Sequence, residues 1–256
     1  KKIDDLKYIN RATKGVYELG SVFKTFTVAN GFNEKLIEPD TKFINLPKKI
    51  KCAGRPIGEY DDQIPTDLTA EEILIRSGNI GSVRIGQKIG IDKFRHFLNS
   101  IGILNKIEFD IEEVGTPIAF KWGKCKLATA SFGHGITTTP LQLAKGYAII
   151  TNGGYDIKPT LIKKTFNKDN RTLILDKDVS NKINPILRKI VSSKAGTANF
   201  ANIEGYEVGG KTGTAQKSIN GVYSKNKINT FAAIFPISAP QYVLIVLLDE
   251  PKPNKE

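Results

Sequence analysis

A serine and a lysine stand three residues apart at the start of a predicted helix. The run Ser21-Val-Phe-Lys24 places a hydroxyl group and an amine one helical turn apart on the same face. Serine is a weak nucleophile at its own pKa and needs an adjacent base. The sequence has two histidines, His96 and His134, and neither has a nucleophile-elbow pattern nearby. Alone, such a pair is more often a helix cap and a surface charge. If Ser21 is a nucleophile, Lys24 is its candidate base, which requires desolvation or a neighbouring positive charge to lower the pKa of Lys24 well below about 10.4.

Two further motifs follow Ser21 in the chain. Ser77-Gly-Asn79 comes after a predicted helix end, and Lys211-Thr-Gly-Thr214 lies on a predicted strand. Taken singly, such residues have commoner structural explanations, with Ser21 as a helix cap and Lys211 as a charge that protects an edge strand. Together, a Ser-x-x-Lys on a helix, a Ser-x-Asn in a loop and a Lys-Thr-Gly on a strand are typical of penicillin-binding proteins and related β-lactamases.

The residues around these motifs carry a closer resemblance. Four segments resemble the transpeptidase domain of monofunctional (class B) penicillin-binding proteins, and the division-specific subgroup most of all: Tyr17-Glu-Leu-Gly-Ser-Val-Phe-Lys24, Ala130-Ser-Phe-Gly-His-Gly-Ile136, Thr139-Pro-Leu-Gln-Leu143 and Gly209-Gly-Lys-Thr-Gly-Thr-Ala-Gln216. The resemblance runs from about Asn10 to Pro251. It implies a peptidoglycan D,D-transpeptidase, a serine acyltransferase of cell-wall synthesis in cell division and cell shape.

The resemblance implies the α+β serine penicillin-recognising fold, with a helical lobe and an antiparallel sheet. We expect residues 1–256 to form one partial transpeptidase domain, with a helical region at about 21–194 and a β meander at about 206–249. In this family, sheet strands precede the nucleophile helix and a helix follows the last strand. Because twenty residues precede Ser21 and the sequence stops at Glu256, we expect incomplete N-terminal strands and truncation at both ends. The parent protein is expected to be anchored in the cytoplasmic membrane, with this domain on the periplasmic side.

The same resemblance gives each motif residue a role. Lys24 would take the proton from Ser21 as it attacks the carbonyl of a D-Ala-D-Ala peptide end. Ser77, between Lys24 and Lys211, would relay a proton to the departing amine, and the charge of Lys211 would help to lower the pKa of Lys24. An amine from a second stem peptide would resolve the acyl-enzyme and form the cross-link, and β-lactams would acylate Ser21.

The remaining motif residues are expected to bind substrate. Asn79 would hold an amide carbonyl, Thr212 and Thr214 the terminal carboxylate, and Gly213 would leave room along the strand edge. The backbone N–H groups of Ser21 and Thr214 would form the oxyanion hole. No cofactor or metal is expected. The expected partners are peptidoglycan stem peptides, β-lactam antibiotics and other cell-division proteins, without nucleic acid.

The sequence also gives expectations for three residues to which no catalytic role is assigned. We expect Glu18 to be structural, His134 to lie in a loop near the cleft, and Trp122 to pack against other side chains.

Other enzymes and sensors of this fold remain alternative functions for the chain. A β-lactamase needs a base that deacylates the serine, and no Glu-x-x-Leu-Asn run of class A enzymes lies between Asn79 and Lys211. A D-Ala-D-Ala carboxypeptidase differs only in its acceptor, water, and a β-lactam sensor would share the adduct.

A phosphate-loop NTPase is a remote alternative, because Gly205-Tyr-Glu-Val-Gly-Gly-Lys-Thr212 fits that pattern and an apolar run ends at Asp249. A phosphate loop must lead directly into a helix, however. Here Gly213 and the Asn220-Gly221 turn favour a hairpin.

The composition limits other functions. Thirty-eight Lys and Arg against 26 Asp and Glu give a net charge of +12, which makes an anionic polymer a possible ligand, but no arginine cluster indicates nucleic-acid binding. Cys52 and Cys125 form no metal-ligand pattern, and whether their thiols meet stays open.

The hydrophobic pattern predicts the elements that position these motifs. Helical spacing predicts helices over 21–31, 70–76, 91–100, 140–152 and 184–193, with capping boxes at Thr69–Glu72 and Thr139–Gln142 and a stop at Gly31. Residues 32–68 are rich in Pro, Gly and Asp and are predicted to form a loop. Strand-forming runs at 206–215, 228–236 and 241–249, with the Asn220-Gly221 turn, predict an antiparallel meander.

Overall fold

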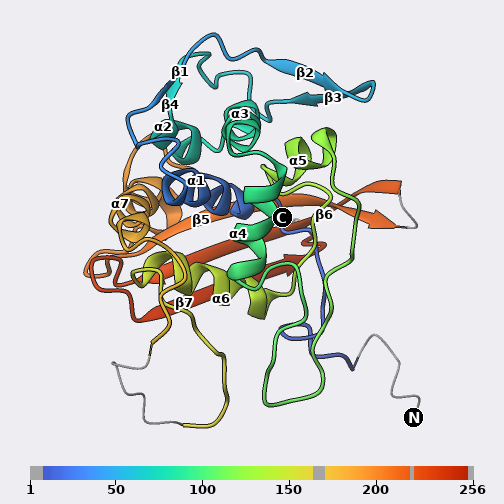
Figure 1. Ribbon diagram of the computed structural model, residues 1–256, viewed down its shortest axis with the longest axis vertical. Helices are drawn as coiled ribbons and strands as arrows, with labels where there is room; N and C mark the ends of the chain where they lie inside the picture. The colour runs from blue at the N-terminus through green and yellow to red at the C-terminus, as the bar shows by residue number, and fades with distance from the viewer. Residues whose placement is uncertain (1–7, 164–170, 220–221, 253–256) are drawn as a thin grey trace.

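A three-stranded antiparallel sheet forms the C-terminal part of the computed structural model, which describes residues 8–163, 171–219 and 222–252 (Figure 1). The strands are β5 (Gly209–Ile219), β6 (Val222–Phe235) and β7 (Tyr242–Asp249), in the order β5-β6-β7. The register pairs Lys211 with Ala232 on β6. The predicted meander is confirmed, and the Asn220-Gly221 turn lies outside the described residues. Helices and this sheet together confirm the α+β fold class.

One face of the sheet is covered by helices. Side chains of β7 alternate between half-buried and exposed, as expected for a strand with one covered face. The covered face packs against α6 (Pro140–Thr151) and α7 (Asp178–Ser192) (Figure 1). The apolar residues of α7 recur at helical spacing and are buried in the core: Val179, Ile183, Ile186, Leu187, Ile190 and Val191.

Helix α7 corrects the prediction that a helix starts at Asn184-Pro185. It begins at Asp178, and Pro185 lies inside it. Proline removes a helical hydrogen bond and is disfavoured there. The continuous apolar face of α7 packs on the core on both sides of Pro185, and this packing stabilises the helix although Pro185 lies inside it.

The nucleophile segment begins earlier and more tightly than predicted. Residues Gly20–Phe23 form a 3₁₀ turn that leads into α1 (Lys24–Asn33). Ser21 lies in this turn and its side chain caps nothing. The expected stop at Gly31 is wrong, because α1 continues to Asn33. A Cβ on Gly31 would lie 2.6 Å from Ile37 Cδ1, so this glycine serves close packing.

Around α1 lies a lobe of helices and short strands, drawn in the upper part of Figure 1. The helices are α2 (Ala70–Ile75), α3 (Asn79–Ile89), α4 (Ile91–Ser100) and α5 (Lys124–Ala130). Both predicted capping boxes, at Thr69 and Thr139, are confirmed. Helices α3 and α5 were not predicted.

The predicted loop over 32–68 contains two small antiparallel sheets. Strand β1 (Lys42–Phe43) pairs with β4 (Leu68–Thr69), and β2 (Lys49–Cys52) pairs with β3 (Arg55–Gly58). These strands are two to four residues long, too short for a periodic pattern to reveal.

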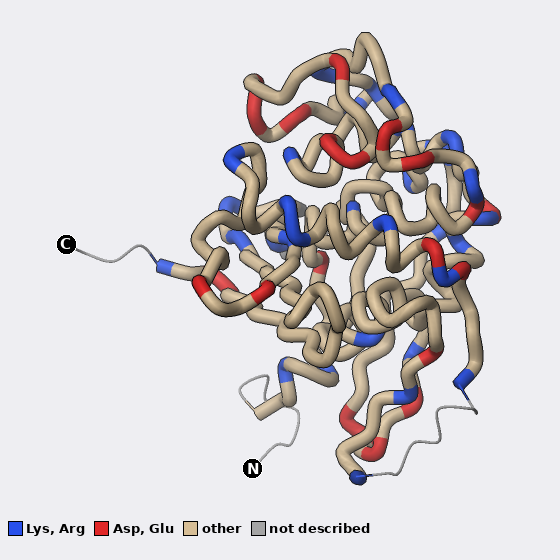
Figure 2. Tube along the Cα trace, turned by 90° about the vertical axis from the view of Figure 1, so that its left-hand side faces the viewer, with Lys and Arg blue, Asp and Glu red and all other residues tan. Residues whose placement is uncertain are grey.

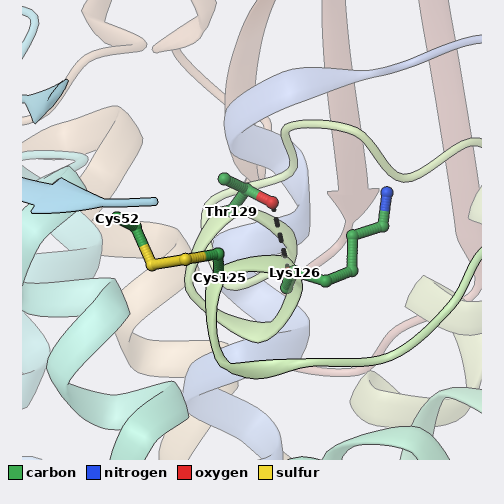
Figure 3. Close-up of a disulfide and its surroundings, with 4 residues drawn as sticks. All are labelled: Cys52, Cys125, Lys126 and Thr129. Atoms are coloured by element: carbon green, nitrogen blue, oxygen red, sulfur yellow. Dashed lines mark hydrogen bonds between the residues drawn. A yellow bond between two sulfur atoms is a disulfide. The ribbon is translucent and has the colours of Figure 1, made fainter. Parts of the chain in front are cut away.

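A disulfide between Cys52 and Cys125 resolves the question that the sequence left open. Figure 3 shows Cys52 at the end of β2 and Cys125 on α5, with the Lys126 side chain pointing away from the sulfur atoms. The bond therefore ties the β2–β3 hairpin to α5 across 73 residues of chain.

Removing this disulfide is expected to lower the free energy of unfolding. In the chain-entropy model a loop of this length contributes about 4 kcal/mol, mainly by restricting the unfolded chain. Urea unfolding of the wild type, with and without reductant, and of the Cys52→Ser, Cys125→Ser double variant tests this. The double variant should match the reduced wild type, and equal midpoints for the oxidised and reduced protein would contradict the expectation.

The described part of the chain has neither a membrane-spanning helix nor a metal cluster. None of its helices is both long and apolar enough to cross a bilayer. Among the same residues, no three His, Cys, Asp or Glu side chains gather in a way that could hold a metal ion. Figure 2 shows Lys and Arg spread over the molecule among Asp and Glu.

Candidate active site

A cleft of about 560 Å³ brings the predicted site residues together. It lies between the nucleophile turn, the start of α3, the loop at 131–134 and β5. Six predicted residues line it: Ser21, Ser77, Asn79, Thr212, Gly213 and Thr214. The other two, Lys24 and Lys211, are completely buried next to it. All eight therefore meet in one place, although they span 194 positions of the chain from Ser21 to Thr214.

The two buried lysines converge on the Ser77 hydroxyl group. Lys24 Nζ lies 3.1 Å from Ser77 Oγ, and Lys211 Nζ lies 2.9 Å from the same atom. Lys24 also donates to the Ser77 carbonyl, and Lys211 to the Thr212 carbonyl at 2.9 Å. Ser77 holds this position with a φ of 60°, a left-handed conformation that is uncommon for serine.

Burial changes the protonation of both lysines. It lowers the pKa of Lys24 from 10.5 to about 7, and the negative charge of Glu59 opposes this shift. The pKa of Lys211 also falls well below its usual value, first because of burial and second because of the positive charge of Lys24. The sequence allowed either desolvation or a neighbouring positive charge to lower the pKa of Lys24, and in the structure desolvation is the main cause.

Ser21 stands beside this lysine pair without a direct bond to it. Within the described residues, no hydrogen bond joins Ser21 Oγ to Lys24 Nζ. The Lys24 amine instead donates to Ser77. Catalytic hydrogen bonds are often long without substrate and tighten in the complex.

Glycines let three segments close around Ser21. A Cβ on Gly213 of β5 would lie 2.4 Å from the Leu19 carbonyl oxygen, and one on Gly20 would lie 2.4 Å from the Thr214 carbonyl oxygen. On the other side, a Cβ on Gly133 would lie 1.9 Å from the Gly20 carbonyl oxygen. Since any side chain would push these backbones apart, the position of Ser21 depends on all three glycines.

Asn79 and Glu59 link the β2–β3 hairpin region to the cleft. Asn79 Nδ2 donates to the Gly58 carbonyl at 2.8 Å. The Glu59 carboxylate accepts from the backbone N–H groups of Asn79 and Ile80, at 2.6 and 2.9 Å, and so caps α3. The sequence did not predict Glu59, because a cap supplied from twenty residues upstream leaves no local pattern.

Thr197 is a second cleft residue that the sequence did not predict. Its hydroxyl lies 2.8 Å from that of Thr212, and both threonines line the cleft. Thr197 precedes a 3₁₀ turn at Asn199–Ala201 and belongs to no motif that relates it to β5.

The structure shows what His134, Trp122 and Glu18 contact. His134 lines the cleft, as expected. Trp122 packs against Phe94 and Phe120, with ring centroids 6.2 and 4.8 Å away. Glu18 accepts a hydrogen bond from the backbone N–H of Gly135 at 2.8 Å.

The Gly-Lys-Thr run does not have the geometry of a phosphate loop. Lys211 and Thr212 lie inside β5, which continues to Ile219, so no helix follows the run. Asp249 ends an antiparallel strand. The phosphate-loop interpretation is therefore wrong on structural grounds.

The chain belongs to the family described as the penicillin-binding protein transpeptidase domain, whose family model matches residues 1–256. Among curated relatives, it is 30% identical to the probable peptidoglycan D,D-transpeptidase FtsI of Caulobacter vibrioides, over 98% of this chain and 44% of that protein. It is 31% identical to the stage V sporulation protein D of Bacillus subtilis, over 92% of this chain and 38% of that protein. The chain thus spans less than half the length of either relative.

Solved structures give the same family. The apo transpeptidase domain of Burkholderia pseudomallei penicillin-binding protein 3 superposes with a TM-score of 0.87 at 26% identity, over 94% of this chain and 74% of that one. Penicillin-binding protein 3 of Mycobacterium tuberculosis in complex with ampicillin superposes with a TM-score of 0.84 at 25% identity, over 94% of this chain and 58% of that one.

Proposed function

We propose that this chain is the acyl-transfer domain of a peptidoglycan D,D-transpeptidase that is also acylated by β-lactams. One observation carries the proposal: two buried lysines meet at the Ser77 hydroxyl in a cleft lined by Ser21. The Caulobacter relative, a probable peptidoglycan D,D-transpeptidase, supports the choice of substrate, and the tuberculosis protein in complex with ampicillin supports the choice of inhibitor.

Acylation begins with proton transfer from Ser21. With a pKa of about 7, a substantial fraction of Lys24 is neutral at neutral pH and able to accept the Ser21 proton. Ser21 Oγ then bonds to the carbonyl carbon of the penultimate D-Ala, and the negative charge moves to the carbonyl oxygen. When this intermediate collapses, the C–N bond breaks and the terminal D-Ala leaves. Ser77, in contact with both lysines, passes a proton to the departing amine.

Strand β5 binds the substrate end. The backbone N–H groups of Ser21 and Thr214 stabilise the oxyanion, and one such donor is worth about 100–1,000-fold in rate. Thr212 and Thr214 hold the substrate carboxylate through their hydroxyl groups, next to the Lys211 amine. Asn79 keeps a second amide N–H for the substrate, since its bond to Gly58 uses one of two.

The acceptor decides between the enzymes that share this site. A transpeptidase passes the acyl group to an amine, a carboxypeptidase passes it to water, and a β-lactamase hydrolyses the antibiotic adduct rapidly. The test uses a peptide ending in D-Ala-D-Ala, with and without a D-amino acid acceptor, and nitrocefin in a separate assay. We expect an amide product with the acceptor and negligible nitrocefin turnover. Release of free acid alone would indicate a carboxypeptidase, and fast nitrocefin turnover would reject the transpeptidase.

The rate of Ser21 acylation by a fluorescent penicillin is expected to rise with pH and to level off above about 7, because Lys24 is a base only when neutral. Glu59→Gln should move the midpoint to lower pH, since the Glu59 charge raises the Lys24 pKa. Exposed Glu112→Gln is the control and should leave the midpoint unchanged. A midpoint that stays in place or rises in Glu59→Gln would contradict this account of Lys24.

The parent protein is proposed to be anchored in the cytoplasmic membrane with this domain outside the cytoplasm, among other cell-division proteins. The Caulobacter relative is named a probable peptidoglycan D,D-transpeptidase FtsI, and both the FtsI name and the peptidoglycan in that name support this location. Labelling of intact cells with a penicillin that does not cross the cytoplasmic membrane tests it. Labelling that requires lysis of the cells would contradict the location.

A further inference from the structure

The Glu18 carboxylate joins three segments that lie far apart in the sequence. Its Oε2 accepts from the Gly135 backbone N–H at 2.8 Å. The Tyr223 hydroxyl on β6 donates to the same carboxylate, with distances of 3.1 and 3.2 Å to its two oxygens. Glu18 itself lies three residues before Ser21. Because its side chain is only 15% exposed, these charge-assisted bonds are poorly screened by water.

Two of these segments supply stacked rings, of which Phe132 and His134 line the cleft and Tyr223 packs against His134. The His134 ring stacks on Tyr223 with centroids 4.5 Å apart, and on Phe132 with centroids 5.9 Å apart. His134 Nδ1 lies 4.0 Å from Glu18 Oε2. One carboxylate therefore contacts both the loop that carries His134 and the strand that carries the Tyr223 ring stacked on it.

The charges around Glu18 favour this arrangement at neutral pH. Burial and the Glu18 charge raise the pKa of Tyr223, so its hydroxyl keeps the proton that it donates. Burial lowers the pKa of His134, and Lys126 lowers it further, while Glu18 opposes both. On the outer side, Lys126 Nζ donates to the Gly135 carbonyl, which holds the same loop residue that Glu18 binds through its N–H.

We propose that Glu18 is a positioning residue that holds the cleft residue His134, and the Tyr223 ring stacked on it, against the segment that carries Ser21. The same loop contains Gly133, whose backbone touches that of Gly20, so a loop displaced at Gly135 would also release the nucleophile turn. The proposal rests on the proposed function for its kinetic effect, but the contact itself can be tested without catalysis.

The test compares Glu18→Ala with Glu18→Gln. The alanine variant removes both contacts, and we expect the rate constant of penicillin acylation to fall at least about tenfold, since misplacement by about 1 Å can cost 100-fold. The glutamine variant keeps the geometry, because its amide oxygen accepts from Gly135 and its NH₂ donates to the Tyr223 oxygen. Its rate should stay within about threefold of the wild type. A merely structural role would lower stability in Glu18→Ala without slowing acylation of the folded protein.

The two histidines provide an independent readout by NMR. His96 is exposed on α4 and serves as an internal reference for the imidazole resonances. Glu18→Gln should lower the pKa of His134, because it removes the charge that raises it. The His96 resonances should be the same as in the wild type. Glu18→Ala should also shift the ring protons of His134 as the stack on Tyr223 loosens.

The results of these experiments distinguish the positioning role of Glu18 from the proposed acyl-transfer function. If Glu18→Ala is acylated as fast as the wild type and its His134 resonances do not move, the positioning role is wrong. If the wild type forms no penicillin adduct while His134 responds to both variants, the contact stands and the proposed function fails. Slow acylation in Glu18→Ala together with recovery in Glu18→Gln would support the positioning role.

Discussion

Lys24→Met is expected to lower the rate constant of Ser21 acylation by about 100- to 10,000-fold, the range that a positioned general base contributes. Methionine replaces the amine with an apolar group of similar length, so it fills the buried site and abolishes the base. The measurement is the rate of adduct formation with a fluorescent penicillin. The matched control is Lys88→Met, which removes an exposed lysine of α3.

Lys24→Met should also change how the free energy of unfolding depends on pH. The folded pKa of Lys24, about 7, lies below the unfolded value near 10.4, so the unfolded chain binds more protons between these values. The free energy of unfolding of the wild type should therefore contain a component that rises with pH from about 7 to 10, and Lys24→Met should lose it. A Lys24→Met protein that is folded and acylated at the wild-type rate would reject Lys24 as the base.

Gly133→Ala is expected to give the second large effect. The new Cβ would overlap the Gly20 carbonyl oxygen, so the nucleophile turn must shift. Because this turn supplies one oxyanion donor, we expect acylation to slow by about 100- to 1,000-fold. The measurement is again the acylation rate, with circular dichroism to confirm the fold.

Gly205→Ala is the matched control for Gly133→Ala. Gly205 has a φ of 80° and Gly133 one of 86°, but a Cβ on Gly205 would meet nothing within 4 Å. The control therefore carries the same backbone strain without the clash. If both variants were acylated at equal rates, the close approach of the 131–134 loop to Gly20 would have no part in catalysis.

The motifs predicted which residues lie together in the cleft better than the hydrophobic pattern predicted the elements between them. Ser21, Lys24, Ser77 and Lys211 belong to short motifs that match the pattern typical of penicillin-binding proteins and related β-lactamases. Strands such as β7 are continuous runs of strand-forming residues, and capping boxes are local, so both could be predicted.

What the sequence missed depends on contacts between distant segments. Helix α3 begins at Asn79 with a cap from Glu59, and the Cys52–Cys125 bond joins thiols 73 positions apart. The bonds from Tyr223 and Gly135 to Glu18 likewise span more than one hundred positions. No local spacing encodes these pairs, because the fold brings them together only after the helical lobe and the sheet have packed.

Intact-mass measurement after incubation with penicillin tests the central claim most directly. The wild type and Ser21→Ala are compared, with circular dichroism to show that both are folded. We predict one penicillin added per wild-type chain, an adduct that lasts for minutes or longer, and no adduct on Ser21→Ala. A folded wild type without an adduct, or an equal adduct on Ser21→Ala, would contradict the assignment of this cleft as a serine acyl-transfer site.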